Sequence, residues 1–275
     1  MYQPYLTSLS LRPLPLSLCI VTNKLDAKLE RIIDLCSQIC QEILISYDNN
    51  GAEDYRGFTE NKQTTIIPVT WEGYSTTKNK LAAKAKYDWI LSLDADEIPD
   101  EKLLLEIGQL PINSLSVQQQ FYFKRVSILG NYKILFGSWG SDTVVRLYNK
   151  TFTSWNNEKV HEKLMEPKGA VLSRLKGVLY HYTVADFDEY LAKNRKYAQL
   201  SAEKYYAQGK KSSVVKKYLK TAFTFFKEYI LQLGFLDGII GFRLALGNAR
   251  YTYWKYQLLL EKHQSAENSA TKVST

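Results

Sequence analysis

The sequence predicts an α/β protein with a mostly parallel sheet, followed by amphipathic helices. In the first hundred residues, short apolar runs that suit buried strands alternate with segments of helical periodicity. From Phe187 onward, apolar residues recur at helical spacing only. Alternation of strands and helices favours a parallel sheet, because each crossover helix returns the chain to the same end of the sheet.

The elements of the first hundred residues follow from apolar runs and capping residues. Leu16–Val21 is a nearly continuous apolar run, which indicates a buried first strand. Asp26 can cap the helix that follows it, and Ser75 or Thr76 can cap a second helix that reaches residue 85. The other expected strands are 42–47, 64–69 and 87–97, with 117–128 and 143–147 further along the chain.

The stretch Tyr87–Glu97 carries the strongest chemical signal. An apolar run too short for a helix ends in Asp94, Asp96 and Glu97. Residues two apart in a strand face the same side, so Asp94 and Asp96 would project together. Two carboxylates suit Mg²⁺, which completes its shell with water and phosphate oxygens. The Asp-x-Asp pattern is common by chance, and a second copy at 186–188 better fits a solvated helix start.

Lys78 and Asn79 fall in the first turn of the second expected helix. Free backbone N–H groups, the positive end of the helix dipole and an ammonium group would gather there, which suits a phosphate. A single lysine in a helix is more often solvated, so this position alone does not carry the interpretation.

The composition is that of an ordinary globular protein, with 45% apolar residues. Cys19, Cys36 and Cys40 are odd in number and lack Cys-x-x-Cys spacing, so we expect reduced thiols rather than disulfides or a zinc site. Residues 1–18 lack the charged start and continuous apolar core of a signal peptide. No window of about 18 uncharged apolar residues predicts a spanning helix, and we expect a cytoplasmic protein.

The positive charge is concentrated in one segment. The net charge is +8, and between Lys193 and Lys220 there are nine Lys and Arg residues against the single acid Glu203. This points to an anionic partner: nucleic acid, an acidic membrane surface or a phosphorylated substrate. The aromatic-rich helices over 219–260 either lie in a membrane interface or pack against the α/β domain, and the basic segment upstream favours the interface.

These patterns predict three parts of the chain. We expect an α/β domain over residues 1–185 and a basic, amphipathic helical extension over 186–263. The tail over 264–275 is rich in Ser, Ala and Thr, and we expect it to be disordered.

Several short motifs occur in a fixed order along the chain. They are Trp71-Glu72-Gly73-Tyr74, Lys78-Asn79, Asp88-Trp89-Ile90-Leu91, Leu93-Asp94-Ala95-Asp96-Glu97, Arg146-Leu147-Tyr148, Val160-His161-Glu162, His181 and Gly234-Phe235-Leu236-Asp237-Gly238. This series resembles the family 2 glycosyltransferases, and most closely the lipopolysaccharide inner-core β-1,4-glucosyltransferases, over roughly residues 16–260. The resemblance implies a GT-A (Rossmann-like) fold, a nucleotide-sugar donor, Mg²⁺ or Mn²⁺, and inversion at the anomeric carbon. The Gln-x-x-Arg-Trp motif of processive members is absent, so transfer of a single sugar is implied.

The same resemblance implies roles on the donor side. Asp48, which follows the second strand, would contact the nucleotide base. Lys78 and Asn79 would lie near the base or the phosphates. Asp94 would face the ribose and the metal, and Asp96 would bind the metal.

The resemblance also implies roles near the metal and the acceptor. His181 is similar to the histidine that completes the metal site in many GT-A enzymes. Glu162 or His161 would lie near the acceptor. A sugar hydroxyl is a poor nucleophile at neutral pH and needs a general base within hydrogen-bond distance. Glu162 is the first choice for this base, with His161 as the alternative.

The implied reaction moves one sugar, glucose by resemblance, from a donor such as UDP-glucose to a lipid-linked lipopolysaccharide or lipooligosaccharide core. We expect peripheral contact with the cytoplasmic face of the inner membrane and no nucleic-acid partner. One alternative is a metal-dependent nucleotidyltransferase, which would release pyrophosphate. The other is a non-catalytic basic protein that binds membranes or nucleic acid and loses this binding as salt rises.

Overall fold

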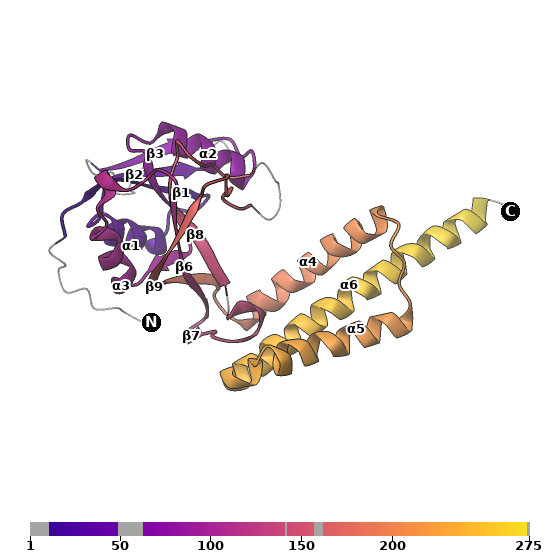
Figure 1. Ribbon diagram of the computed structural model, residues 1–275. Helices are drawn as coiled ribbons and strands as arrows, with labels where there is room; N and C mark the ends of the chain where they lie inside the picture. The colour runs from indigo at the N-terminus through magenta and orange to yellow at the C-terminus, as the bar shows by residue number, and fades with distance from the viewer. Residues whose placement is uncertain (1–10, 49–62, 141, 157–161, 274–275) are drawn as a thin grey trace. The chain divides into compact units, whose positions relative to one another are not determined.

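The computed structural model describes residues 11–48, 63–140, 142–156 and 162–273 (Figure 1). The chain divides into two compact units. The first comprises Met1–Arg125 and Asp142–His181, and the second comprises Val126–Ser141 and Tyr182–Thr275. The sequence predicts a single boundary at residue 185, whereas the second unit also takes in the segment 126–141.

Four parallel strands form one half of the sheet, in the order β3-β2-β1-β4. Their carboxyl ends share one edge, as the alternation of strands and helices predicts. In chain order, the first three strands match predicted apolar runs to within two residues at either end, and the fourth lies inside the predicted stretch 87–97 and ends three residues before it. The strands are β1 (Leu14–Thr22), β2 (Cys40–Tyr47), β3 (Thr64–Pro68) and β4 (Trp89–Asp94).

The other half of the sheet contains antiparallel pairs, which the sequence pattern does not predict. It continues from β4 in the order β8-β6-β9-β5, and the short β7 pairs with β6. The predicted stretch 87–97 is therefore not one strand, because β4 ends at Asp94 and Glu97 starts β5. The strands are β5 (Glu97–Pro99), β6 (Gln119–Leu129), β7 (Tyr132–Lys133), β8 (Asp142–Asn149) and β9 (Val171–Val184).

Helices cover both faces of the parallel strands (Figure 1). On one face α1 (Ala27–Cys36) and α3 (Glu101–Gly108) contribute to the larger core, and on the other α2 (Tyr74–Lys84) packs on a smaller core. Asp26 caps α1 as predicted, its carboxylate accepting two backbone N–H bonds. The N-cap of α2 is Gly73, with φ of 97°, in place of the predicted Ser75 or Thr76.

The three cysteines are buried free thiols in this part of the chain, as the sequence predicts. Burial raises the pKa of Cys19 to about 12, to which Glu42 adds, and burial alone raises the pKa of Cys36 to about 12. These side chains therefore pack as small apolar groups rather than as reactive thiolates.

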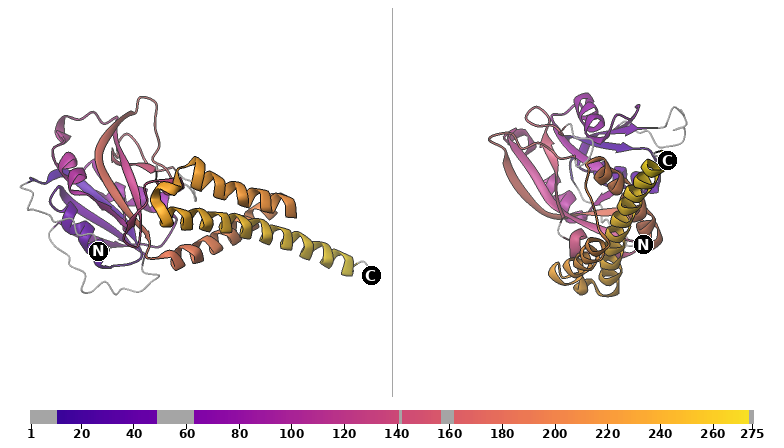
Figure 2. Two further views of the ribbon diagram at one scale, coloured as in Figure 1. Left: turned by 90° about the horizontal axis from the view of Figure 1, so that it is seen from below. Right: turned by 90° about the vertical axis from the view of Figure 1, so that its right-hand side faces the viewer.

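The second unit is mainly helical, and α4 and α5 each run along α6 (Figure 2). The predicted break at Gly234–Gly238 is confirmed as a short 3₁₀ turn between α5 and α6. The predicted disordered tail differs, because α6 continues to Val273. Residues 264–273 contain Ala, Glu and Lys and no Gly or Pro, which allows the helix to propagate. The elements are α4 (Phe187–Ala207), α5 (Val214–Phe226), η3 (Lys227–Leu231), η4 (Gly234–Asp237) and α6 (Gly238–Val273).

Within the described residues, no single helix is long and apolar enough to cross a membrane. The bent pair Val214–Leu231 and Gly234–Ala266, with an angle of 72° between its helices, would meet the criterion by length and composition alone.

Candidate active site

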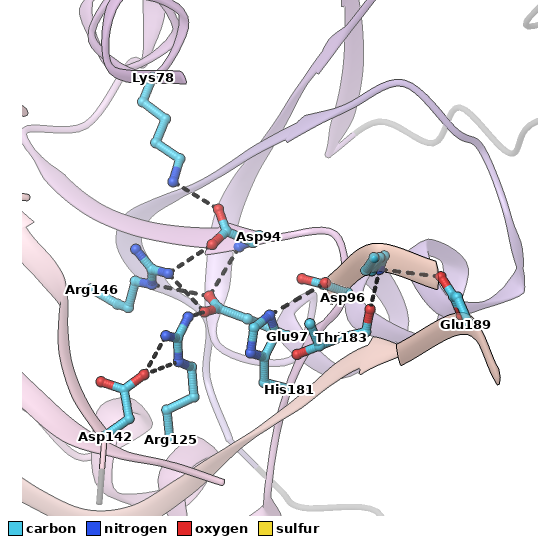
Figure 3. A network of polar contacts seen from close by, with 11 residues as sticks. Lys78, Asp94, Asp96, Glu97, Arg125, Asp142, Arg146, His181, Thr183 and Glu189 are labelled. Carbon is cyan, nitrogen blue, oxygen red and sulfur yellow. Dashed lines mark hydrogen bonds and ion pairs between the residues drawn. The ribbon is translucent and has the colours of Figure 1, made fainter. Parts of the chain in front are cut away.

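Asp94 is the last residue of β4, at the edge where the parallel strands end. Its Oδ1 lies 2.7 Å from the Nζ of Lys78, and its Oδ2 lies 2.7 Å from a guanidinium nitrogen of Arg146 (Figure 3). Burial by itself would raise the pKa of Asp94, but the charges of Arg146 and Lys78 outweigh it and hold the pKa well below its usual range. Asp94 is therefore a carboxylate clamped between two cations.

Glu97 is fully buried and lies behind Asp94, where it bonds the arginines of this network. It accepts two hydrogen bonds from Arg146, at 2.7 and 3.0 Å, and one from Arg125 at 3.0 Å. It also accepts the backbone N–H of Asp94 at 3.1 Å. Arg125 is paired in turn with Asp142 (Figure 3). With Lys78, the network contains three cations and three carboxylates, so it is neutral as a whole.

Asp96 lies in the turn between β4 and β5, beside His181. The antiparallel register pairs Glu97 with His181, which brings the histidine to this turn. The His181 Nε2 lies 3.3 Å from the Asp96 carboxylate (Figure 3). Burial raises the pKa of Asp96, but the hydrogen bond and charge of His181 outweigh it and lower the pKa overall. Since the chain turns after β4, Asp94 and Asp96 have different partners and are not the side-by-side pair that alternation predicts.

Trp155 forms a platform beneath the cations of the site. The Nζ of Lys78 lies 4.4 Å from its ring centroid, and the guanidinium carbon of Arg146 lies 5.5 Å from it. Such cation–π contacts stabilise buried cations. Asn79 fixes the backbone of Trp155 through two hydrogen bonds of 2.9 Å, one in each direction. Both polar groups of the Asn79 side chain are thus engaged in positioning Trp155, and a contact with the nucleotide stays a prediction.

The remaining predicted residues lie at different distances from this network. Glu162 reaches it, with its carboxylate 3.6 Å from the Nζ of Lys78. Asp48 follows β2 directly, and its backbone N–H bonds the carbonyl of Thr22 at the end of β1, on the same sheet edge. His161 lies outside the described residues.

The donor atoms can be tested for their fit to a divalent cation. Among the described residues, no group of three or more His, Cys, Asp or Glu side chains is arranged to hold a metal. Asp96 and His181 supply one oxygen and one nitrogen donor close together. Each carboxylate oxygen of Asp94 already contacts a cationic side chain, which disfavours binding of a metal cation there as well. The donor set fits a cation that takes two protein ligands and completes its shell with water and phosphate oxygens, but not a closed protein cage.

A cavity of about 430 Å³ lies apart from these groups, along α2 and β3. The described residues that line it include Ser46, Thr70 and Lys80, and none of the predicted site residues is among them. The charged network, not this cavity, is therefore the chemically distinctive place in the first unit.

Five residues of the site have no role assigned from the sequence: Glu97, Arg125, Asp142, Arg146 and Trp155. For Arg146 a signal exists, because a charged side chain inside the apolar strand run Thr143–Leu147 must find a buried partner. Its partners are more than forty residues away in the sequence, and no local pattern identifies them.

The fold and the site define a mixed α/β protein with an ion network and a carboxylate–histidine pair at the edge where the parallel strands end. This architecture agrees with the GT-A fold that the motifs imply and with the helical extension that the periodicity predicts. No family model matches the chain.

Comparison with known proteins finds relatives that are described as glycosyltransferases. A protein from Rickettsia typhi described as an uncharacterized glycosyltransferase is 25% identical over 240 residues, covering 82% of this chain and 80% of its own length. One from Rickettsia felis with the same description is 26% identical over 273 residues, covering 93% and 95%. The lipopolysaccharide core biosynthesis glycosyltransferase LpsC of Rhizobium meliloti is 24% identical over 256 residues, covering 91% and 93%.

The resemblance to glycosyltransferases is thereby confirmed: over most of its length the chain is similar to proteins described as glycosyltransferases. Among solved structures, residues 1–349 of Staphylococcus aureus TarS cover 91% of both chains at 13% identity. The TM-score between the two structures is 0.41, and we base no conclusion on this similarity.

Proposed function

We propose that this protein is an inverting glycosyltransferase that moves a single sugar from a nucleoside diphosphate sugar to a lipopolysaccharide or lipooligosaccharide core acceptor. Glucose from UDP-glucose is the donor we favour, and the cytoplasmic face of the inner membrane is the place. One observation carries the proposal. Motif residues from distant parts of the sequence, at 78, 94–97, 146, 162 and 181, meet in one site of the first unit. The core acceptor is supported by the similarity to LpsC.

The charge of the site supports a divalent cation as a partner of the donor. The three cations of the network face five carboxylates once Asp96 and Glu162 are counted. Counted without His181, these groups carry a formal charge of −2, which would repel a diphosphate. We propose that Asp96 and His181 hold Mg²⁺ or Mn²⁺, which would stabilise the negative charge that develops on the leaving diphosphate.

The residues of the chain supply positioning and proton transfer. The acceptor hydroxyl oxygen forms a bond to the anomeric carbon, the bond from that carbon to the diphosphate oxygen breaks, and the configuration inverts. Glu162 takes the hydroxyl proton, since an ionised carboxylate is a competent general base. Lys78 and Arg146 fix Asp94 at the strand end, where it would contact the ribose, and Asp48 would contact the base.

The proposal is tested by identifying products. The full chain is incubated with nucleoside diphosphate sugars and a truncated core acceptor, with Mn²⁺, Mg²⁺ or chelator. We expect release of the nucleoside diphosphate, a β-linked product from an α-linked donor by NMR, and loss of turnover with chelator. Release of pyrophosphate would instead identify a nucleotidyltransferase. Binding of membranes or nucleic acid without turnover of any donor would favour the non-catalytic alternative.

A further inference from the structure

Helix α5 exposes a continuous row of large apolar side chains. Val215, Leu219, Phe223 and Phe226 of α5, and Ile230 of η3, which follows α5 directly, are between 43% and 68% exposed, and their spacing of three or four residues puts them on one face. We call these five residues the α5 surface. A monomeric soluble protein seldom exposes so many large apolar side chains together, so this face is suited to a partner.

The opposite face of α5 is already used inside the second unit. Lys217 is buried and donates a hydrogen bond to Gln257 of α6 at 2.8 Å. The hydroxyls of Thr224 and Thr252 lie 3.1 Å apart. Since α5 packs on α6 through these residues, its apolar row points away from that contact.

Lysines border the α5 surface along one side. Lys216, Lys220 and Lys227 are exposed, and at about 100° per residue they fall within a quarter turn of the apolar row. A row of apolar side chains with a basic border is the pattern of helices that lie in the plane of a membrane interface.

The two acids near this surface are directed elsewhere. Between residues 210 and 243 the sequence contains only Glu228 and Asp237 as acids. Glu228 accepts the backbone N–H of Ser138 at 3.1 Å, and Asp237 accepts those of Leu135 and Phe136. Their charges are engaged by the segment 135–138, so the lysine border offers positive charge to whatever binds the α5 surface.

We propose that the α5 surface lies in the interface of an anionic lipid bilayer, with its apolar row among the acyl chains and its lysines at the lipid phosphates. This inference specifies the surface for the membrane contact named in the proposed function, and its biological role rests on that function. Charge complementarity favours lipid over a second copy of this chain, because a two-fold contact would bring the same lysines together. Lys216, Lys220 and Lys227 also disfavour burial of α5 as half of a broken span.

The inference is tested with vesicles and the full chain. Co-sedimentation of the protein is compared between vesicles of phosphatidylcholine alone and vesicles in which about one third of the lipid is phosphatidylglycerol. We expect binding to the anionic vesicles that weakens with salt. Each lysine near an anionic surface contributes roughly fivefold, so the triple change Lys216→Gln, Lys220→Gln and Lys227→Gln should weaken partitioning about 100-fold. The double change Leu219→Gln and Phe223→Gln should weaken it by about tenfold or more.

Matched controls lie in the first unit. Lys102, Lys168 and Lys176 are exposed, and their triple change to Gln removes the same charge. Val171 and Leu172 are 47% and 45% exposed, and their double change to Gln removes apolar surface of comparable exposure. Both controls should bind anionic vesicles like the unaltered chain.

Three outcomes would overturn the inference. One is equal loss of binding in the controls and the α5 variants. Another is a dimer in solution that the Leu219 and Phe223 changes dissociate, without vesicle binding. The third is retention in vesicles after alkaline carbonate, as expected for a broken span. The vesicle assay contains no nucleotide sugar, so it is independent of the transfer assay. Vesicle binding without sugar transfer would therefore reject the proposed function and leave this inference standing. Transfer to a soluble acceptor without vesicle binding would do the reverse.

Discussion

Arg146 and Glu97 form the buried centre of the site. Arg146 donates three hydrogen bonds of 2.7 to 3.0 Å, two to Glu97 and one to Asp94. Removing a charged group from water is costly, and the cost is offset only when hydrogen-bonded counter-charges surround it. Glu97 also faces Arg125, so two guanidinium groups share this carboxylate.

This arrangement predicts that Glu97→Ala destabilises the fold strongly. Two buried or part-buried cations would lose their shared partner, and the free energy of unfolding should fall by about 3–5 kcal/mol. Urea denaturation measures the change. Glu72→Ala is the matched control, since Glu72 pairs with Lys80 in an exposed ion pair, and its effect should stay below about 1 kcal/mol. Equal effects of the two changes would show that the network contributes little to stability.

Glu162 and His161 are the two predicted bases, and substitution separates them. We expect Glu162→Gln to lower kcat by about 10² to 10⁴ while the affinity for the donor changes little, because the amide cannot accept the hydroxyl proton. His161→Gln should leave kcat within a few fold. Steady-state kinetics with a soluble acceptor checks both variants. The opposite ranking would transfer the role to His161.

At the scale of elements, close approach of α4 and α6 depends on Gly247. A Cβ at this position would lie 2.3 Å from the ring of Tyr190. That ring is buried, its hydroxyl bonds Asn248 and the carbonyl of Leu244, and Trp139 packs against it edge to face. The ring therefore has little freedom to move aside.

We predict that Gly247→Ala destabilises the second unit although alanine is the better helix former. The clash should cost about 1–3 kcal/mol, against about 1 kcal/mol gained from helix propensity. Thermal unfolding followed by circular dichroism measures the net effect. Arg250→Ala, at an exposed position of the same helix, should change stability by less than about 0.5 kcal/mol. An increase in stability for Gly247→Ala would contradict the packing described.

Sequence patterns predict those elements that depend on local signals. The parallel strands, the Asp26 cap and the helix start at Asp186 all follow from apolar runs and capping residues. Strand β9 was not predicted, because Lys, Arg and Gly interrupt its apolar pattern and its stability comes from pairing with distant strands. The turn after Asp94 was missed for a related reason, since β5 exists only through its pairing with β9.

The candidate site divides in the same way. Lys78, Asp94, Asp96, Glu162 and His181 were selected from the sequence by motif resemblance, and all five lie at or next to the network. The layer that holds them in place was not predictable, because Glu97 with Arg146 is a contact between β5 and β8. Such long-range charge pairs leave no periodic signal in the sequence.

At the scale of the whole molecule, the two units carry different features. The first contains the ion network and the Asp96–His181 pair, and the second carries the α5 surface. Segment 126–141 joins the second unit because Asp237 and Glu228 accept its backbone N–H groups. The Gly234–Gly238 motif therefore has a structural function in that unit, because it forms the turn before α6 and supplies Asp237.

We propose that Asp96, beside the ion network, is part of a sugar-transfer site. The most direct test measures nucleoside diphosphate release from UDP-glucose with a core acceptor and Mn²⁺, for the unaltered chain, Asp96→Asn and Asp88→Asn. Asp88 is 60% exposed, and its ion pair with Lys150 is long at 3.8 Å. It is therefore a matched carboxylate outside the site. We predict at least about a 100-fold loss for Asp96→Asn and no loss for Asp88→Asn, with both variants folded. Full activity of Asp96→Asn in the presence of chelator would contradict the account.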